Sequence, residues 1–214
     1  MSMKATAQAP ASRSQNTRTA LIECAESLFG AHGVEGVSLR QIGAASGSAN
    51  TGVVAYHFGT KQALLQAVIE HRLPAIEARR RELFARAETS GRALDLRDLM
   101  EILYLPFFEQ VDAAGQHSYA AFMGALFRAD LIEVRQALSA DYPVTRDVAQ
   151  RITALLDPGA AARFHPRIEL VSAMIFAAIR RLDHPGLTDA ALRFEDVLCT
   201  ACAALAAPPY QNRS

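Results

Sequence analysis

Apolar residues recur every three or four positions along most of the chain, which is the spacing that places side chains on one face of a helix. A first helix is expected from Asn16 or Thr17, either of which can cap it, to about Ala31. Gly33 can take the left-handed conformation that ends a helix. The apolar face of this helix carries Leu21, Ala25, Leu28 and Phe29. Because long alternating β-branched stretches are missing, the pattern predicts an all-α fold.

The segment from Ser38 to Lys61, SLRQIGAASGSANTGVVAYHFGTK, predicts two short helices joined by a tight turn. Ser38 and Gln41 have the spacing of a capping box, so a helix is expected to begin there. The turn is Ser46-Gly47-Ser48, and the next helix is expected from about Asn50 to His57. Two short helices set at a steep angle place one of them in the major groove of DNA. The segment therefore predicts a helix-turn-helix that binds double-stranded DNA.

A fourth helix can be capped by Thr60, and it meets Pro74, which removes a backbone hydrogen bond and bends or ends a helix. We therefore expect a domain boundary between His71 and Pro74. The predicted organisation is a disordered arm over residues 1–15, a DNA-binding domain over residues 16–72 and a helical ligand-binding and dimerisation domain over residues 73–210. The arm is expected to be disordered because it is rich in Ala, Ser, Gln and Pro.

Beyond the boundary, helices are expected at Leu94–Val111, Tyr119–Phe127, Leu131–Ser139, Thr145–Leu156, Pro166–Leu182 and Thr188–Ala206. The stretch Glu77–Arg86 is dense in Glu and Arg, and we expect a solvated helix face rather than a second DNA contact. The last two helices are strongly apolar and rich in Ala, which favours an interface between two copies of the chain over burial within one. A homodimer also suits a protein that reads a palindrome.

The amino-acid composition says less about function than the spacing of apolar residues does. The 22 basic and 22 acidic residues give a formal net charge of zero, whereas nucleic-acid binders usually carry a basic excess. DNA affinity is therefore expected to come from a few well-placed cations, backbone amides and a dimer. No apolar run is long enough for a membrane span, and no signal peptide is expected. Three cysteines that provide no disulfide framework favour a reduced, cytoplasmic setting.

Candidate DNA contacts begin in the first turn of the second helix. The hydroxyl of Ser38 suits a phosphate, and Arg40 is of the residue type that most often reads guanine. Ser38 as a plain cap and Arg40 as a surface cation are the alternatives. Further phosphate contacts are expected from His57 and Lys61, and a purely structural role is the alternative for His57.

Base-reading side chains are expected on the exposed face of the third helix, at Asn50, Thr51, Gly52 and Val53. Asparagine can pair with two atoms of adenine, and the methyl groups of threonine and valine can pack on thymine. Glycine would allow close approach of the backbone. The alternative for Asn50 is a plain N-cap. Val54 and Phe58 are expected in the core.

Aromatic residues cluster in two neighbouring helices of the second domain. The candidate ligand-binding residues are Tyr104, Phe107, Phe108, His117, Tyr119, Phe122, Met123 and Phe127. Aromatic walls with a few polar groups suit a small-molecule pocket, and Pro106 could open space by bending its helix. The alternative is ordinary core packing. Nothing in the sequence defines the chemistry of this unknown effector.

Three cysteines, Cys24, Cys199 and Cys202, provide no disulfide framework. Cys199 and Cys202 form a CxxC motif on an apolar helix without a second pair of ligands, which favours packing over metal binding. No phosphate loop, His-Glu metal motif or nucleophile elbow is present, so no enzyme activity, metal or cofactor is expected. The alternatives are a helical enzyme or redox protein that uses Cys199, Cys202 and His184, and a DNA-binding protein without a ligand.

An ordered set of residues across the first helices resembles the TetR family of bacterial one-component repressors. The matching residues are Thr17-Arg18, Leu21-Ile22, Ala25, Leu28-Phe29, Gly33-Val34, Ser38-Leu39-Arg40-Gln41-Ile42, Gly47, Tyr56-His57-Phe58-Gly59-Thr60-Lys61 and Leu64-Leu65. The resemblance implies a three-helix DNA-binding head, a connecting fourth helix and a divergent ligand-binding body. It further implies a homodimer whose last two helices pair with their mates, and release of a palindromic operator when a small molecule binds.

The resemblance also carries roles for single residues. It assigns phosphate contacts to Ser38, Tyr56, His57 and Lys61, and base reading to Arg40 and the exposed face of the third helix. Two departures change the expected contacts. The segment Gly47–Phe58 is one residue longer than the common pattern, which shifts the register before the third helix. Ala55 stands where many members carry a phosphate-contacting tyrosine.

Overall fold

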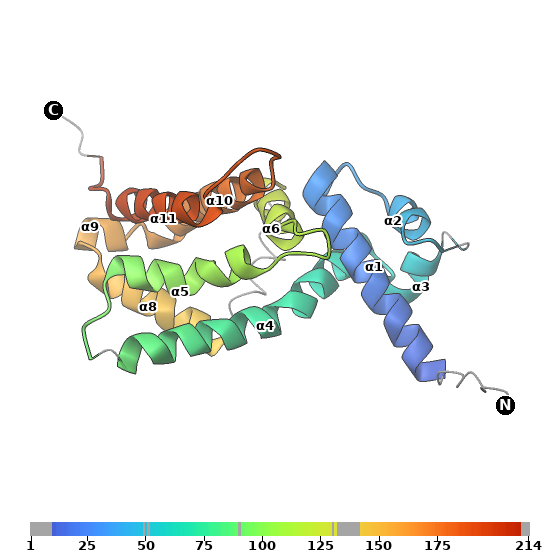
Figure 1. The fold of residues 1–214 in the computed structure, drawn as a ribbon, viewed down its shortest axis with the longest axis horizontal. Coiled ribbons are helices and arrows are strands. Elements are labelled where there is room, and N and C mark those ends of the chain that lie inside the picture. Colours follow the sequence, from blue (N-terminus) through green and yellow to red (C-terminus); the bar gives the residue numbers. More distant parts are fainter. Residues whose placement is uncertain are drawn as a thin grey trace.

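The computed structural model describes residues 10–48, 50, 52–89, 91–129, 131 and 142–210. Within these ranges all regular elements are helices, which confirms the predicted all-α fold. The first helices are α1 Pro10–His32, α2 Leu39–Ala45, α3 Val53–Phe58 and α4 Lys61–Thr89. The others are α5 Leu96–Glu109, α6 Ser118–Arg128, α8 Pro143–Leu155, α9 Pro158–Ala161, α10 Phe164–Leu182 and α11 Ala190–Ala206. Figure 1 shows a head of α1 to α3 at one end of an elongated bundle, with α4 running from one to the other.

Helix α1 begins at Pro10, several residues before the expected start at Asn16 or Thr17. Its early residues include Ala, Arg and Gln, which are good helix formers and allow the helix to extend toward the N-terminus. The part of the expected disordered arm from Pro10 to Gln15 is therefore helical, and the rest of that arm lies outside the described residues. At the other end, Gly33 has φ of 79°, as expected for the residue that ends this helix.

Helix α4 passes through Pro74 without ending, so the expected boundary between His71 and Pro74 falls inside a continuous helix. Leu73 and Ile76, on either side of the proline, are both buried. Burial of this apolar face outweighs the one backbone hydrogen bond that the proline removes. Helix α4 packs against α1, α5 and α8.

The expectation of a solvated face over Glu77–Arg86 is wrong at two positions, because the side chains of Glu77 and Arg80 are buried. The carboxylate of Glu77 accepts hydrogen bonds from the backbone N–H of Val144, at 2.7 Å, and from the hydroxyl of Thr145, at 2.8 Å. Arg80 donates to the same hydroxyl and to a backbone carbonyl of α5. Residues three apart share a face of a helix, so both follow Leu73 and Ile76 into the body.

The body is built around α6 and α10, which pack closely against each other, while α11 covers α10 and α5. The predicted helices at Leu94–Val111, Tyr119–Phe127, Thr145–Leu156, Pro166–Leu182 and Thr188–Ala206 correspond to α5, α6, α8, α10 and α11. The predicted helix Leu131–Ser139 lies outside the described residues except for Leu131. Across the described ranges, no helix combines the length and apolar character needed to cross a membrane.

Candidate DNA-contacting surface

The two short helices of the head are held by a shared apolar core. Ile42 of α2 and Val54 of α3 are fully buried. They pack in a core with α1 and the loop before α2, through Leu21, Ile22, Ala25, Phe29, Val34 and Val37. Figure 1 shows α2 and α3 beside α1, on the side of the head that faces away from the body. The outer faces of both short helices are therefore left to solvent.

Helix α2 begins with the capping box that the sequence predicts. Gln41 donates its backbone N–H to the hydroxyl of Ser38 at 3.3 Å, and the side-chain oxygen of Gln41 accepts from the backbone N–H of Ser38 at 2.8 Å. The Ser38 hydroxyl also donates to that side-chain oxygen. Ser38 is thus a cap, and it is exposed. Arg40, in the first turn of the helix, is exposed and has no hydrogen bond or ion pair with a described residue.

Helix α3 begins later than expected, at Val53 rather than about Asn50, and extends to Phe58. The side chain of Asn50 accepts a hydrogen bond from the backbone N–H of Gly52 at 2.9 Å, and the hydroxyl of Ser48 accepts from the backbone N–H of Asn50. Such local side-chain bonds compete with helix formation, which explains the later start. Asn50 therefore lies in the loop before α3, Gly52 is the N-cap, and Thr51 lies outside the described residues.

The exposed face of α3 differs from the predicted one. Val53 is half-buried and packs against the core, so it is not the freely exposed side chain that base reading was expected to use. Tyr56 is 85% exposed, and its ring meets that of the half-buried His57 edge to face at 5.2 Å. The protruding groups of this surface are therefore Asn50, Gly52 and Tyr56, together with Arg40 on α2. Val54 is buried and Phe58 is half-buried, as core positions should be.

Two cations flank α3 and rest on aromatic rings of the head. The Nζ atom of Lys61, the first residue of α4, lies 5.8 Å from the ring centre of Phe29. Thr60 caps this helix as predicted, because its hydroxyl accepts from the backbone N–H of Ala63. The guanidinium carbon of Arg18 on α1 lies 5.1 Å from the ring centre of Phe58. Arg18 was not among the predicted DNA contacts. It lies one turn before the buried Ile22 on the same face of α1, which indicates a position at the edge of the core.

A buried ion pair ties the head to the body. Glu26 of α1 is only 1% exposed, and both of its carboxylate oxygens accept from the guanidinium of Arg72 on α4, at 2.7 and 3.1 Å. The hydroxyl of Ser118, at the start of α6, donates to the same carboxylate at 2.6 Å. Gly30 lets α1 and α6 cross closely, since a Cβ there would lie 3.0 Å from that of Ala121. Sequence reasoning missed this junction, although an acidic residue next to the apolar face of α1 was a signal.

The predicted ligand-binding residues lie together in the body, where they pack on one another. Tyr104, Phe107, Tyr119, Phe122 and Met123 are buried, while Phe108 and Phe127 are half-buried. The rings of Phe107 and Tyr119 stack at 5.7 Å. The hydroxyl of Tyr104 lies 2.6 Å from that of Ser172, and burial raises the pKa of Tyr104 to about 12. His117 is buried with both ring nitrogens engaged, at the side chain of Asp183 and the carbonyl of Phe108.

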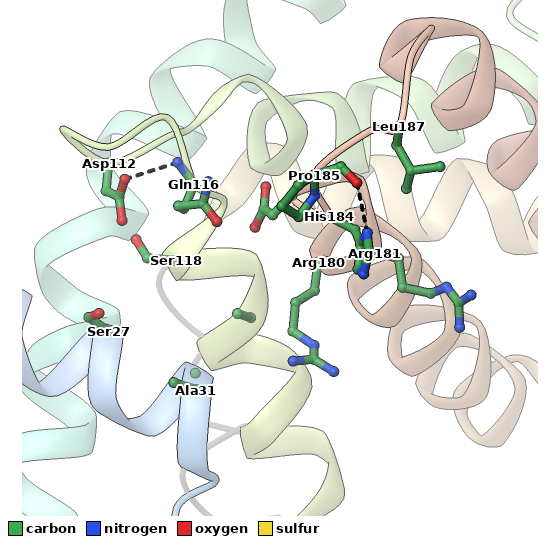
Figure 2. Close-up of a pocket in the computed structure, with 13 residues that line it drawn as sticks. Ser27, Ala31, Asp112, Gln116, Ser118, Arg180, Arg181, His184, Pro185 and Leu187 are labelled. Atoms are coloured by element: carbon green, nitrogen blue, oxygen red, sulfur yellow. Dashed lines mark hydrogen bonds between the residues drawn. The ribbon is translucent and has the colours of Figure 1, made fainter.

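A crevice of about 710 Å³ lies elsewhere, between α1, the start of α6 and the end of α10. Figure 2 shows Ser27 and Ala31 of α1 on one side and Arg180 and His184 on the other. The predicted ligand-binding residues do not line this crevice.

The two cysteines of the CxxC motif have different environments. Cys199 is exposed and Cys202 is half-buried on α11, and burial raises the pKa of the Cys202 thiol to about 11. A thiol with a raised pKa is mostly protonated at neutral pH and is a poor nucleophile or metal ligand. Among the described residues, no group of three or more His, Cys, Asp and Glu side chains could hold a metal ion. His184 contacts the carbonyl of its neighbour Pro185.

Comparison with known proteins places the head in a family. Residues 21–68 match the family described as bacterial regulatory proteins, tetR family. No curated protein matches the chain significantly.

Among solved structures, native NalD, the secondary repressor of the MexAB-OprM multidrug efflux pump in Pseudomonas aeruginosa, is 24% identical with a TM-score of 0.54. The match covers 91% of this chain and 98% of that one. A second NalD structure from the same organism is 23% identical over 92% of this chain and 98% of that one, with a TM-score of 0.53. The TetR-family regulator PfmR from Thermus thermophilus is 16% identical over 89% of this chain and 99% of that one, with a TM-score of 0.47.

Proposed function

We propose that the chain, whose residues 21–68 match the tetR family of bacterial regulatory proteins, is a regulator of that family that represses transcription by binding a palindromic operator as a homodimer. A small molecule bound in the body is proposed to release the operator. The observation that carries the proposal is the head itself. Its capped α2 and exposed α3 stand on a common core, with Arg40 and Tyr56 unobstructed and Lys61 beside them. NalD, which shares the fold, is a repressor.

The positions of Arg40 and Lys61 in the head support different roles in DNA binding. Arg40 projects freely from α2, so it can reach a base edge, where arginine pairs with two atoms of guanine. Lys61 is half-buried at the start of α4 with its ammonium group over Phe29, which limits it to a phosphate near the head. Ser38, Tyr56 and His57 are proposed as further phosphate contacts, and Asn50 and Gly52 as neighbours of the bases.

A mobility-shift assay with DNA from upstream of the chain's own gene tests the proposal. We expect a protein dimer to bind a short palindrome in that DNA more tightly than a scrambled duplex of the same length and composition. Affinity for the specific site should fall as salt rises, because bound cations displace counterions from phosphates. Equal affinity for the scrambled duplex would remove the claim of operator recognition.

Replacing Arg40 with alanine is expected to relax base preference, with a loss of about 1–3 kcal/mol at the contacted base pair. Replacing Lys61 with alanine is expected to weaken binding to every sequence and to reduce the salt slope by about one. Affinities for the palindrome and for its single-base variants, measured at several salt concentrations, separate the two effects. If both variants lost the same affinity for every DNA sequence, the separate roles proposed for Arg40 and Lys61 would be contradicted.

The outer face of α10 and α11 supports the proposed dimer. Leu170 of α10 is 73% exposed and Leu192 of α11 is 69% exposed, and these are large apolar side chains on packed helices. Along α10, Leu170 is followed on the same face by Ala173 and Ala177, whose small side chains allow another helix to approach. Exposed leucines next to small residues are what an interface between two copies requires.

Replacing Leu170 with arginine is expected to convert the dimer to monomer at micromolar concentration, because it places a charge at the centre of the proposed interface. Analytical ultracentrifugation measures the change. The matched control is Leu155→Arg, since Leu155 is also a half-exposed leucine, at 51%, but lies on α8. A Leu170→Arg protein that sediments like the Leu155→Arg control would contradict the interface.

The effector site is proposed among the aromatic residues of the body. Tyr119 is buried there, and its hydroxyl has no hydrogen-bond partner within the described part of the chain. Buried polar groups are nearly always paired, so a ligand that offers an acceptor would satisfy it. Thermal-shift screening should find compounds that stabilise the protein and lower its operator affinity together. Compounds that stabilise the protein without changing operator affinity would contradict an effector role for this site.

A further inference from the structure

The crevice between α1, the start of α6 and the end of α10 lies where the head meets the body. Its volume of about 710 Å³ is in the range of sites for small organic molecules. Figure 2 shows its two sides, with α1 and Ser118 facing the last turn of α10 and the loop that follows it. A molecule in this space would touch the DNA-binding head and the body at once.

Arg180 provides the crevice with a positive charge that no described residue pairs with through a hydrogen bond or an ion pair. Phe176, one turn earlier on α10, packs against Gly124 of α6, so Arg180 follows on the same face toward the start of α6. Figure 2 shows the side chain of Arg180 extended alongside α6, whereas that of Arg181 points away from α6. The guanidinium of Arg180 is therefore available to a ligand in the crevice.

The carboxylates that line the crevice are already engaged. Asp183 accepts hydrogen bonds from the backbone N–H of His117, at 3.0 Å, and contacts the Nδ1 atom of the same residue. Asp112 accepts from the backbone N–H groups of Ala114 and Gln116, at 2.8 and 2.9 Å. The negative charges are therefore held by the protein itself, and the charge left for a ligand is that of the guanidinium.

Small and apolar residues, among them Ala31, Ala121 and Leu187, form part of the remaining walls, next to the polar side chains of Gln116 and His184. Ser27 adds a hydroxyl from α1 on the side opposite Arg180. A guanidinium pairs with both oxygens of a carboxylate, and apolar walls favour a hydrocarbon body. We propose that the crevice is a binding site for a small hydrophobic carboxylate, held by Arg180. This site is separate from the aromatic cluster of the body.

Because the site lies where the head meets the body, a ligand bound there would regulate operator binding. This inference rests on the proposed DNA-binding function. Helix α1 crosses α6 at Gly30 and is tied to it through the bond between Glu26 and Ser118. A carboxylate bound between α1 and α10 lies next to the contact between α1 and α6. Its binding shifts the head relative to the body. Ligand and operator then change each other's affinity by the same factor.

Isothermal titration calorimetry on the full chain tests the site, with 2-naphthoate and octanoate as probes and their neutral amides as controls. Both carboxylates are expected to bind saturably, and the amides at least about tenfold more weakly, because a hydrogen-bonded charge is lost. Arg180→Gln is expected to weaken carboxylate binding at least about tenfold. Arg146→Gln, which changes an exposed arginine on α8, is expected to bind like the unmodified protein.

A second variant blocks the space without changing charge. Ala31→Trp adds a large ring from the exposed end of α1 and is expected to abolish binding of both probes. The proposal is overturned if neither carboxylate binds saturably, or if Arg180→Gln and Ala31→Trp bind them like the unmodified protein.

Operator affinity is then measured with and without 2-naphthoate. A change that Arg180→Gln abolishes supports regulation, and an unchanged affinity despite binding overturns it. Failure to bind any operator overturns the proposed function and leaves the calorimetric result standing.

Discussion

Replacing Arg72 with methionine is expected to lower the free energy of unfolding by about 3 kcal/mol, near the lower end of the range for breaking a buried ion pair. Glu26 is almost completely buried, and its partner Arg72 supplies two of its three side-chain hydrogen bonds. Methionine keeps the apolar stem but leaves the carboxylate with the hydroxyl of Ser118 alone. Removing one partner costs more than the pair contributes, because the remaining charge stays out of water.

Urea denaturation at neutral pH measures this loss. The matched control is Arg79→Met, because the guanidinium of Arg79 also forms a bidentate hydrogen bond with a carboxylate, that of Glu109, at 2.6 and 2.7 Å. That pair is partly exposed on both sides, and its removal is expected to cost less than about 1 kcal/mol. Equal losses for the two variants would show that the junction of head and body is no more than a surface contact.

The same variant bears on function, because Arg72 and Glu26 connect α4 to α1 and Ser118 connects α1 to α6. Under the proposed function, a signal that passes from the body to the candidate DNA-contacting surface would cross this junction. We therefore expect Arg72→Met protein that is still folded to respond less to effectors in operator binding. The coupling free energy between effector and operator, from binding titrations in both directions, measures this response.

The sequence was most informative where local rules decide the structure. The capping box at Ser38, the cap at Thr60 and the left-handed Gly33 all follow from residue type and spacing alone. The continuation of α4 through Pro74 could not be predicted in this way, because it depends on burial of Leu73 and Ile76 against other helices. Tertiary packing there outweighs the local preference of proline.

The proposed DNA contacts also include some that local rules predict and some that they do not. Arg40 and Tyr56, two of the predicted DNA contacts, are exposed, because they lie on helices whose apolar faces are clear in the sequence. The start of α3 was misplaced, since the bond from the Gly52 amide to the Asn50 side chain is a local alternative to a helical turn. Val53 consequently turns toward the core. Contacts between distant segments, such as Glu26 with Ser118, leave no spacing pattern to detect.

Replacing Glu77 with leucine is expected to lower the free energy of unfolding by about 3–5 kcal/mol, because it leaves Arg80 buried without its counter-ion. Burial lowers the pKa of Arg80 to about 10, so this side chain still carries its charge at neutral pH. Glu77 also caps α8, accepting from the backbone N–H of Val144 and the hydroxyl of Thr145. The variant therefore loses a charge partner and a helix cap together.

The double variant Glu77→Leu with Arg80→Met separates these two losses. It removes both buried charges, and it leaves unpaired the amide of Val144, the hydroxyl of Thr145 and the carbonyl of Leu103. We expect it to be more stable than Glu77→Leu alone, because an unpaired buried charge costs more than an unpaired backbone group. Denaturation of both single variants and the double variant gives the coupling energy. Additive losses would mean that Glu77 acts on α8 alone and that Arg80, 3.9 Å from its carboxylate, is stabilised independently by Leu103 and Thr145.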